Sequence, residues 1–109
     1  MAKEISFEFE GTRYTLAFTK MSVRAMTSNG FAPSMVTDKP AIGVPALFRG
    51  AFLAHHKWVK DDLKDKIYEH MPMKQDLITK LLEMYAEPIN EMFDEPEDDE
   101  KKVTWDSNF

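Results

Sequence analysis

Two adjacent histidines, His55 and His56, are the residues whose type most suggests chemistry, because imidazole binds metals and transfers protons near neutral pH. They lie in the apolar stretch LFRGAFLAHHKW, residues 47–58. A chelating pair on a helix needs ligands three or four positions apart, since only those share a face. The positions four residues away hold no metal ligand: Ala51, Phe52, Val59 and Lys60. The spacing therefore argues against a metal site.

The motifs of common enzyme classes are also missing from the sequence. There is no Gly-x-Ser-x-Gly elbow, no glycine-rich phosphate loop and no His-Glu-x-x-His pattern, and the chain has only 4 glycines. Cysteine is absent, which excludes disulfides, thiolate metal sites and cysteine nucleophiles. Acid pairs such as Asp61 and Asp62 stand where helix caps and solvated faces are expected. We therefore expect a protein that is not an enzyme and that binds no cofactor and no metal.

The charge is distributed unevenly along the 109 residues. Residues 94–109 hold seven acidic residues against two lysines, which accounts for the whole net charge of −5, so that residues 1–93 are neutral. Neither part would attract a phosphate backbone, and we expect no nucleic-acid partner. The sequence has no apolar run near the ~20 residues of a membrane span, and its N-terminus lacks the apolar core of a signal peptide. We therefore expect a soluble, cytoplasmic protein without a membrane partner.

A β-hairpin is predicted at residues 4–19, EISFEFEGTRYTLAFT, where apolar and polar residues alternate on both sides of Gly11. A type II′ loop at Gly11 and Thr12 would place glycine first and would pair Phe9 with Tyr14. All the large apolar residues then share one face. A lone hairpin is marginal in water, so this face must pack on helices, and its open edges invite another strand.

Four helices are expected after the hairpin, over residues 20–29, 45–57, 62–70 and 74–93. Breakers mark residues 31–40 as a loop, and Pro88 should kink or end the last helix. That helix has an apolar stripe of Leu77, Leu81, Met84, Tyr85, Ile89 and Met92. The sequence predicts an α+β fold that is mostly helical, with the hairpin packed on a bundle of about four helices. Residues 1–93 form this single domain, and residues 94–109 form a disordered acidic tail that ends in an aromatic segment.

Small residues recur every four positions in the second predicted helix, at Ala46, Gly50 and Ala54. Glycine inside a helix costs about 1 kcal/mol relative to alanine, so Gly50 indicates a close helix crossing. A crossing within the chain, with the helix at 74–93, is favoured over a contact between subunits. His55 would then lie on the apolar stripe as a buried histidine with a local partner, and His56 would end the helix.

Several apolar residues are candidates for binding a partner. Three of them are methionines, whose flexible side chains suit adaptable surfaces. The chain has 8 methionines, and the bland alternative is that they fill the core. The C-terminal VTWDSNF is interpreted either as a short docking peptide or as a flexible end whose aromatic residues have no binding role. The candidate partner-binding residues are Phe31, Met35, Val36, Met71, Met73, Trp105 and Phe109.

The order of these elements resembles a known family. The hairpin FEFEGTRYTLAFT leads into SVRAMTSNGF, then KPAIGVPALFRGAFLAHHK and KQDLITKLLEMYAEPINEMF, with an acidic tail that ends in aromatics. Over residues 5–93 the chain resembles the small tail assembly chaperones of tailed phages and prophages of Gram-positive bacteria. The likeness rests on the order of elements and on the LFRGAF and LLEMY stretches, since no catalytic signature is involved.

The resemblance implies a protein without catalytic activity that binds the helical tape-measure protein and keeps it soluble during tail assembly. Such chaperones are expected to oligomerise along their client and to be absent from the mature virion. In many phages a frameshift adds a C-terminal extension that recruits tail-tube protein, and no such domain is visible here. Two alternatives stay open: a structural component such as a head–tail connector or tail-completion protein, and a prophage module that binds a host protein through its tail.

Overall fold

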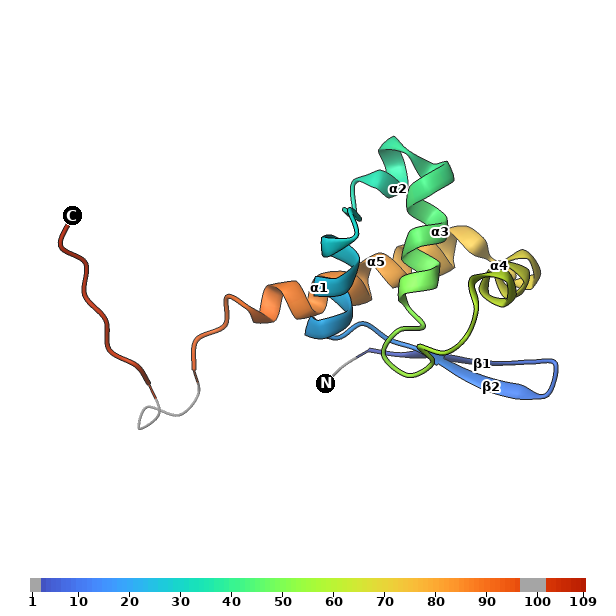
Figure 1. Ribbon diagram of the computed structural model, residues 1–109, viewed down its shortest axis with the longest axis horizontal. Helices are drawn as coiled ribbons and strands as arrows, with labels where there is room; N and C mark the ends of the chain where they lie inside the picture. The colour runs from blue at the N-terminus through green and yellow to red at the C-terminus, as the bar shows by residue number, and fades with distance from the viewer. Residues whose placement is uncertain (1–2, 97–101) are drawn as a thin grey trace.

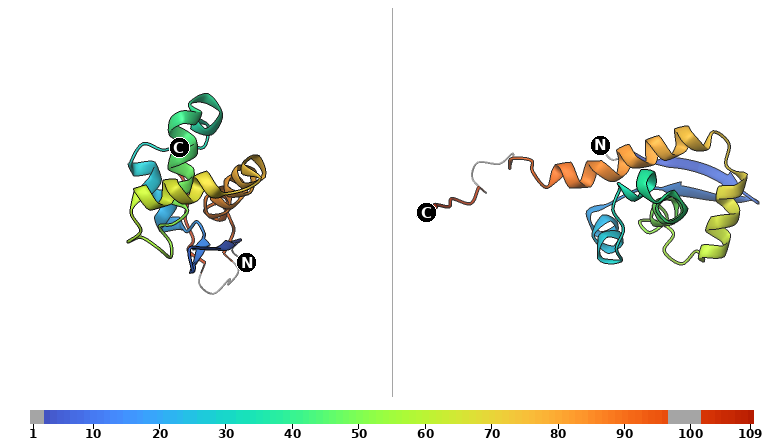
Figure 2. Two further views of the ribbon diagram at one scale, coloured as in Figure 1. Left: turned by 90° about the vertical axis from the view of Figure 1, so that its right-hand side faces the viewer. Right: turned by 90° about the horizontal axis from the view of Figure 1, so that it is seen from above.

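The computed structural model describes residues 3–96 and 102–109 and has the predicted α+β architecture, a two-stranded hairpin against a set of helices (Figure 1). The strands are β1 (Ile5–Phe9) and β2 (Thr12–Leu16). The helices are α1 (Lys20–Ser28), the single turn α2 (Met35–Asp38), α3 (Pro40–Gly50), α4 (Asp61–His70) and α5 (Lys74–Glu91). Residues 94–96 and 102–109 have no regular structure, and residues 102–109 lie away from the body (Figures 1 and 2). The predicted disorder of the tail falls partly on residues 97–101, which lie outside the described residues.

The hairpin has the predicted faces but a register that differs by two residues. Phe7 pairs with Tyr14, and the loop consists of Glu10 and Gly11, with φ angles of 49° and 82°. Two positive φ angles are typical of a type I′ turn, whose twist suits the strands on either side. The type II′ loop predicted at Gly11 and Thr12 is therefore wrong. A slip of two residues keeps every side chain on its face, so the alternating pattern could not distinguish the two registers.

The outer edge of β2 is covered by the chain segment that follows α3. The backbone N–H of Ala17 donates to the carbonyl of Ala51 at 3.0 Å, and the N–H of Thr15 donates to Nε2 of His56 at 2.9 Å. Within the described residues, no backbone hydrogen bond reaches the outer edge of β1. The hairpin thus has one satisfied edge and one open edge.

Helix α1 begins with a capping box. The Thr19 side chain accepts from the N–H of Ser22, and the Ser22 side chain accepts from the N–H of Thr19. This exchange satisfies two N–H groups that have no partner inside the helix. The helix ends at Asn29 followed by Gly30, whose φ of 95° suits glycine. Local signals therefore mark both ends of this helix, whose Val23 and Met26 are buried in the core.

Helix α3 differs from the predicted helix at both ends. It starts at Pro40 and passes through Pro45, whereas the prediction started it at Pro45 and continued it to residue 57. Proline is favourable in the first turn of a helix, so either Pro40 or Pro45 could have marked the start, and the helix starts at Pro40. After Gly50 the chain turns toward the hairpin, where the carbonyl of Ala51 accepts from Ala17. Helical spacing therefore does not apply to residues 51–59.

Two glycines let α3 approach its neighbours closely. A Cβ on Gly50 would meet the side chain of Met26 in α1, so the close crossing at Gly50 is with α1. The predicted crossing with the helix at 74–93, which is α5, is therefore wrong at this position. A Cβ on Gly43 would meet the backbone of Met35 and Val36 in α2. Ala46 lies on α3, but Ala54 follows the end of the helix, so the three small residues do not form one helix face.

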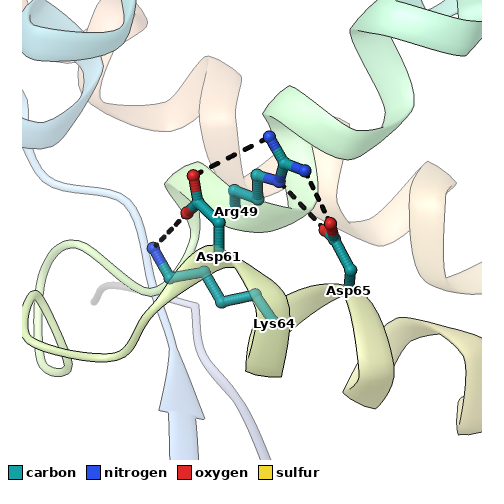
Figure 3. A network of polar contacts seen from close by, with 4 residues as sticks. All are labelled: Arg49, Asp61, Lys64 and Asp65. Atoms are coloured by element: carbon teal, nitrogen blue, oxygen red, sulfur yellow. Dashed lines mark hydrogen bonds and ion pairs between the residues drawn. The ribbon is translucent and has the colours of Figure 1, made fainter.

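An ion-pair network fastens α3 to α4 (Figure 3). The guanidinium of Arg49 donates through Nε and Nη2 to the two carboxylate oxygens of Asp65, at 2.9 and 2.6 Å. This hydrogen bond lowers the pKa of Asp65 and raises the pKa of Arg49. Nη1 of Arg49 also lies 3.8 Å from Asp61, and the buried Lys64 places its ammonium 3.6 Å from the same carboxylate. Asp61 is thus the first residue of α4 and not its N-cap.

Helix α5 buries most of the predicted stripe. Leu81 and Tyr85 are completely buried or nearly so, and Tyr85 contacts the rings of Phe18 and Phe31 at 5.4 and 5.3 Å between centroids. Pro88 lies inside the helix and is buried, so it does not end α5. Met92 follows the last residue of the helix and is half-exposed, contrary to its predicted place in the core. The core joins side chains from the hairpin and from every helix.

We predict that Gly43→Ala destabilises the protein more than Gly50→Ala. Each substitution gains helix propensity, but the new Cβ on Gly43 meets backbone atoms that cannot rotate away, whereas the one on Gly50 meets a flexible methionine. The expected cost is about 1–3 kcal/mol for Gly43→Ala and below about 1 kcal/mol for Gly50→Ala. Urea unfolding of both variants measures this difference, and the reverse order would contradict it.

Candidate binding groove

A cavity of about 880 Å³ lies between the start of α1, the segment after α3 and the C-terminal half of α5. We call it the α1–α5 groove. Its apolar lining comes from Phe18, Met21, Leu53, Trp58, Met84 and Pro88. Two of these side chains are strongly exposed, with 82% of Met21 and 84% of Trp58 accessible to solvent. A groove with exposed apolar side chains at its border is typical of a surface that binds another chain.

Charged side chains surround this apolar lining. Lys3, Lys20 and Lys57 contribute cations, and the ammonium of Lys57 lies 5.0 Å from the centre of the Trp58 ring. Two carboxylates come from α5, Glu87 and Glu91. The groove therefore combines an apolar floor with charges of both signs, with the cations in excess.

Glu87 has an unusual carboxylate. Its Oε2 atom is buried and has no hydrogen-bond partner among the described residues. A buried acceptor without a donor is costly, because it gave up its hydrogen bonds to water. This oxygen can gain a donor from the groove only when the Glu87 side chain, which lines the groove, turns toward it.

The two histidines have roles opposite to those predicted. His55 is exposed and lies 3.2 Å from the carboxylate of Glu4, so it is not the buried member of the pair. His56 is half-buried, packs against Tyr14 at 5.3 Å between ring centroids, and accepts the Thr15 hydrogen bond described above. Among the described residues, no group of three or more His, Asp or Glu side chains is arranged to hold a metal ion. Both histidines therefore contact the hairpin region, His56 at Thr15 of β2 and His55 at Glu4 before β1.

A family model described as "Domain of unknown function (DUF5055)" matches residues 1–109. The chain belongs to the DUF5055 family. No curated protein and no solved structure matches it. In the part of this DUF5055 chain that the structure describes, no helix has the length and apolarity to cross a membrane.

The sequence-predicted contact residues of this DUF5055 protein are not gathered in one place. Phe31 and Val36 are buried in the core. Phe31 and Met35 line a second, smaller cavity of about 360 Å³, which neither Met71 nor Met73 reaches. Met71 is packed against the core, and Met73 is 75% exposed. Trp105 and Phe109 are exposed in the tail segment.

Sequence reasoning missed the residues of the α1–α5 groove. They come from the N-terminus, α1, the segment after α3 and α5, which are far apart in the chain. Two single-residue signals were available. Trp58 stands among charged residues, and Met21 follows a capping threonine on the polar side of a short helix. Neither signal shows that the two side chains border the same cavity.

We predict that His56 makes stability depend on pH. Burial lowers the pKa of His56, and the charge of His55 lowers it further. The neutral ring is also the form that accepts from the Thr15 N–H. The folded protein thus binds fewer protons than the unfolded chain, and stability rises with pH. The contribution is complete above the unfolded pKa of about 6.5 and is lost as pH falls below it, toward the lower folded pKa.

Glutamine at position 56 tests this prediction, because its side-chain oxygen can accept the same hydrogen bond and does not titrate. We expect His56→Gln to weaken the loss of stability between pH 7.5 and 5.5 strongly, and His55→Gln to weaken it less, because burial is the larger cause of the lowered His56 pKa. His56→Ala should cost about 1–3 kcal/mol at pH 7.5, because it leaves the Thr15 N–H without its acceptor. Equal pH slopes for the wild type and His56→Gln, measured by urea unfolding, would refute the role of His56.

Proposed function

We propose that this DUF5055 protein is a tail assembly chaperone without catalytic activity that binds the tape-measure protein of its phage and keeps it soluble. The observation that carries the proposal is the α1–α5 groove with its exposed Met21 and Trp58. The resemblance of residues 5–93 to tail assembly chaperones supplies the identity of the client. The protein acts in the cytoplasm of the bacterial host and is absent from the finished virion.

The groove suits one face of an amphipathic helix. Recognition of this kind places the apolar side chains of the helix, spaced three or four residues apart, into an apolar groove. Met21 and Met84 supply flexible side chains that adapt to different apolar surfaces along a long client. The surrounding lysines and glutamates pair with charges on the borders of the helix stripe. Such a groove can accept many similar segments of one client.

Several copies are expected to bind along one tape-measure protein. A client with repeated helical segments offers many sites, and binding to neighbouring sites raises the effective concentration of each copy. The open outer edge of β1 is one surface that adjacent copies could share, since an unpaired strand edge accepts another strand. A longer form of the protein could add contacts with tail-tube protein.

The tail supports a second candidate function, as a module that binds a host protein. Val103, Trp105 and Phe109 alternate with polar residues and are exposed, with 79% of Trp105 accessible to solvent. Replacing Trp105 and Phe109 by alanine separates the two functions. The substitution abolishes binding to a host protein and leaves the capture of a tape-measure protein intact.

We predict that Met21→Ser together with Trp58→Ser reduces the recovery of the tape-measure protein in a soluble complex by more than about tenfold. Burial of one large apolar side chain contributes about 1.5–3 kcal/mol, and 1.4 kcal/mol corresponds to a factor of ten. The measurement is co-expression with the tape-measure protein of the same phage, followed by a pull-down and sizing of the complex.

The matched control is Ile42→Ser together with Met73→Ser. Both residues are exposed, and neither lines the α1–α5 groove. The control should recover the client as the wild type does. A groove variant that binds normally would move the site elsewhere, and a client that stays insoluble with the wild-type protein would remove the chaperone function.

A further inference from the structure

The tail segment 103–109 has the pattern of a peptide that docks through one face. Its apolar residues Val103, Trp105 and Phe109 are two and four positions apart and are strongly exposed. These even spacings place them on the same side of an extended chain. The segment therefore carries an apolar face for which the described body provides no contact.

The α1–α5 groove lies at the root of this tail. Glu91 lines the groove and is the last residue of α5, from which the tail departs (Figure 2). Val103 follows Glu91 by twelve positions, and an extended chain of that length spans up to about 40 Å. The two shorter dimensions of the molecule are 31 and 25 Å. The connection is thus long enough for the segment to turn back onto the groove.

Charge favours the groove over the open edge of β1. Residues 94–109 carry a net charge of −5, and the groove has three lysines, Lys3, Lys20 and Lys57, against the two carboxylates of Glu87 and Glu91. The β1 strand and its turn instead carry Glu8 and Glu10. Like charges disfavour pairing between the acidic tail and this strand, whereas unlike charges attract the tail to the groove.

The buried Oε2 of Glu87 adds a specific requirement to the occupant of the groove. This oxygen needs a donor, and a donor carried on a large apolar side chain would fit an apolar lining. The indole of tryptophan has this combination, since its ring is apolar and its N–H only donates. Trp105 is the one tail residue with such a side chain.

We propose that residues 103–109 dock into the α1–α5 groove of their own chain, with the Trp105 ring in the apolar lining and its indole N–H donating to the Glu87 carboxylate, which turns toward the groove to accept it. Docking within one chain is favoured because the connection gives a high local concentration of the segment. The tail then covers Met21 and Trp58 until a client displaces it. This last consequence rests on the proposed function, because it requires the client to use the same groove.

Paramagnetic relaxation tests the docking in the full chain and without a client. The chain has no cysteine, so Asn108→Cys accepts a single nitroxide label, and the methionine methyl groups report its position. We expect strong broadening of the Met21 and Met84 signals, which belong to the groove, and weaker broadening of Met35 and Met73, which do not line it. Equal broadening of all four signals, or none, would overturn the proposal.

Variants of the anchor residue separate the ring from its N–H. Trp105→Ala should abolish the selective broadening, whereas Trp105→Phe keeps an aromatic ring and should reduce it partly. Broadening of equal strength in Trp105→Phe and in the reference chain would refute the hydrogen bond to Glu87. These variants change only an exposed tail residue, so the folded body serves as an internal control.

A mixing experiment distinguishes the chain's own tail from the tail of a second copy. Spin-labelled chains without isotopes are mixed with isotope-labelled chains that carry no spin label. Broadening that is as strong in this mixture would overturn docking within one chain and would indicate exchange between copies. Because no client is present, the docking can fail while client capture succeeds, and the reverse is equally observable.

Discussion

The hydrogen bonds on the outer edge of β2 are the constraint from which much of the remaining structure follows. A hairpin of two five-residue strands is marginal alone, and an uncovered edge would invite other strands. The chain meets this requirement by leaving α3 at Gly50, so that Ala51 and His56 can accept from Ala17 and Thr15. The length of α3, the neutral state of His56 and the path of residues 51–59 are consequences of this coverage.

The same path creates the groove. Leu53 and Trp58 belong to the segment that covers the β2 edge, and they form one side of the α1–α5 groove. Had α3 continued to residue 57, this segment would have been a helix face packed on the bundle. The Arg49–Asp65 hydrogen bonds then anchor α3 to α4 on both sides of the segment, because Arg49 precedes it and Asp65 follows it. The coverage of the edge and the shape of the groove are therefore coupled.

The parts of this fold that depend on local signals could be predicted from the sequence. The alternation around Gly11 acts within a few residues, and the hairpin and its faces were predicted from it. The hairpin register was not predicted correctly. A turn at Glu10 and Gly11 and a turn at Gly11 and Thr12 both place the same side chains on each face, so the alternation does not choose between them. The end of α3 depends on a hydrogen bond between Ala17 and Ala51, which are distant in sequence, so helical spacing alone extended the helix too far. The groove was missed for the same reason.

The distribution of exposed apolar side chains gives the strongest argument that the groove end of the molecule is a binding surface. Single exposed apolar residues are ordinary, and Met73 is of this kind. Met21 and Trp58 differ because they border the same cavity. A partner that enters the groove would remove both of these side chains from water at once. A surface of this composition gains more from a partner than scattered residues do, whether that partner is a client helix or the chain's own tail.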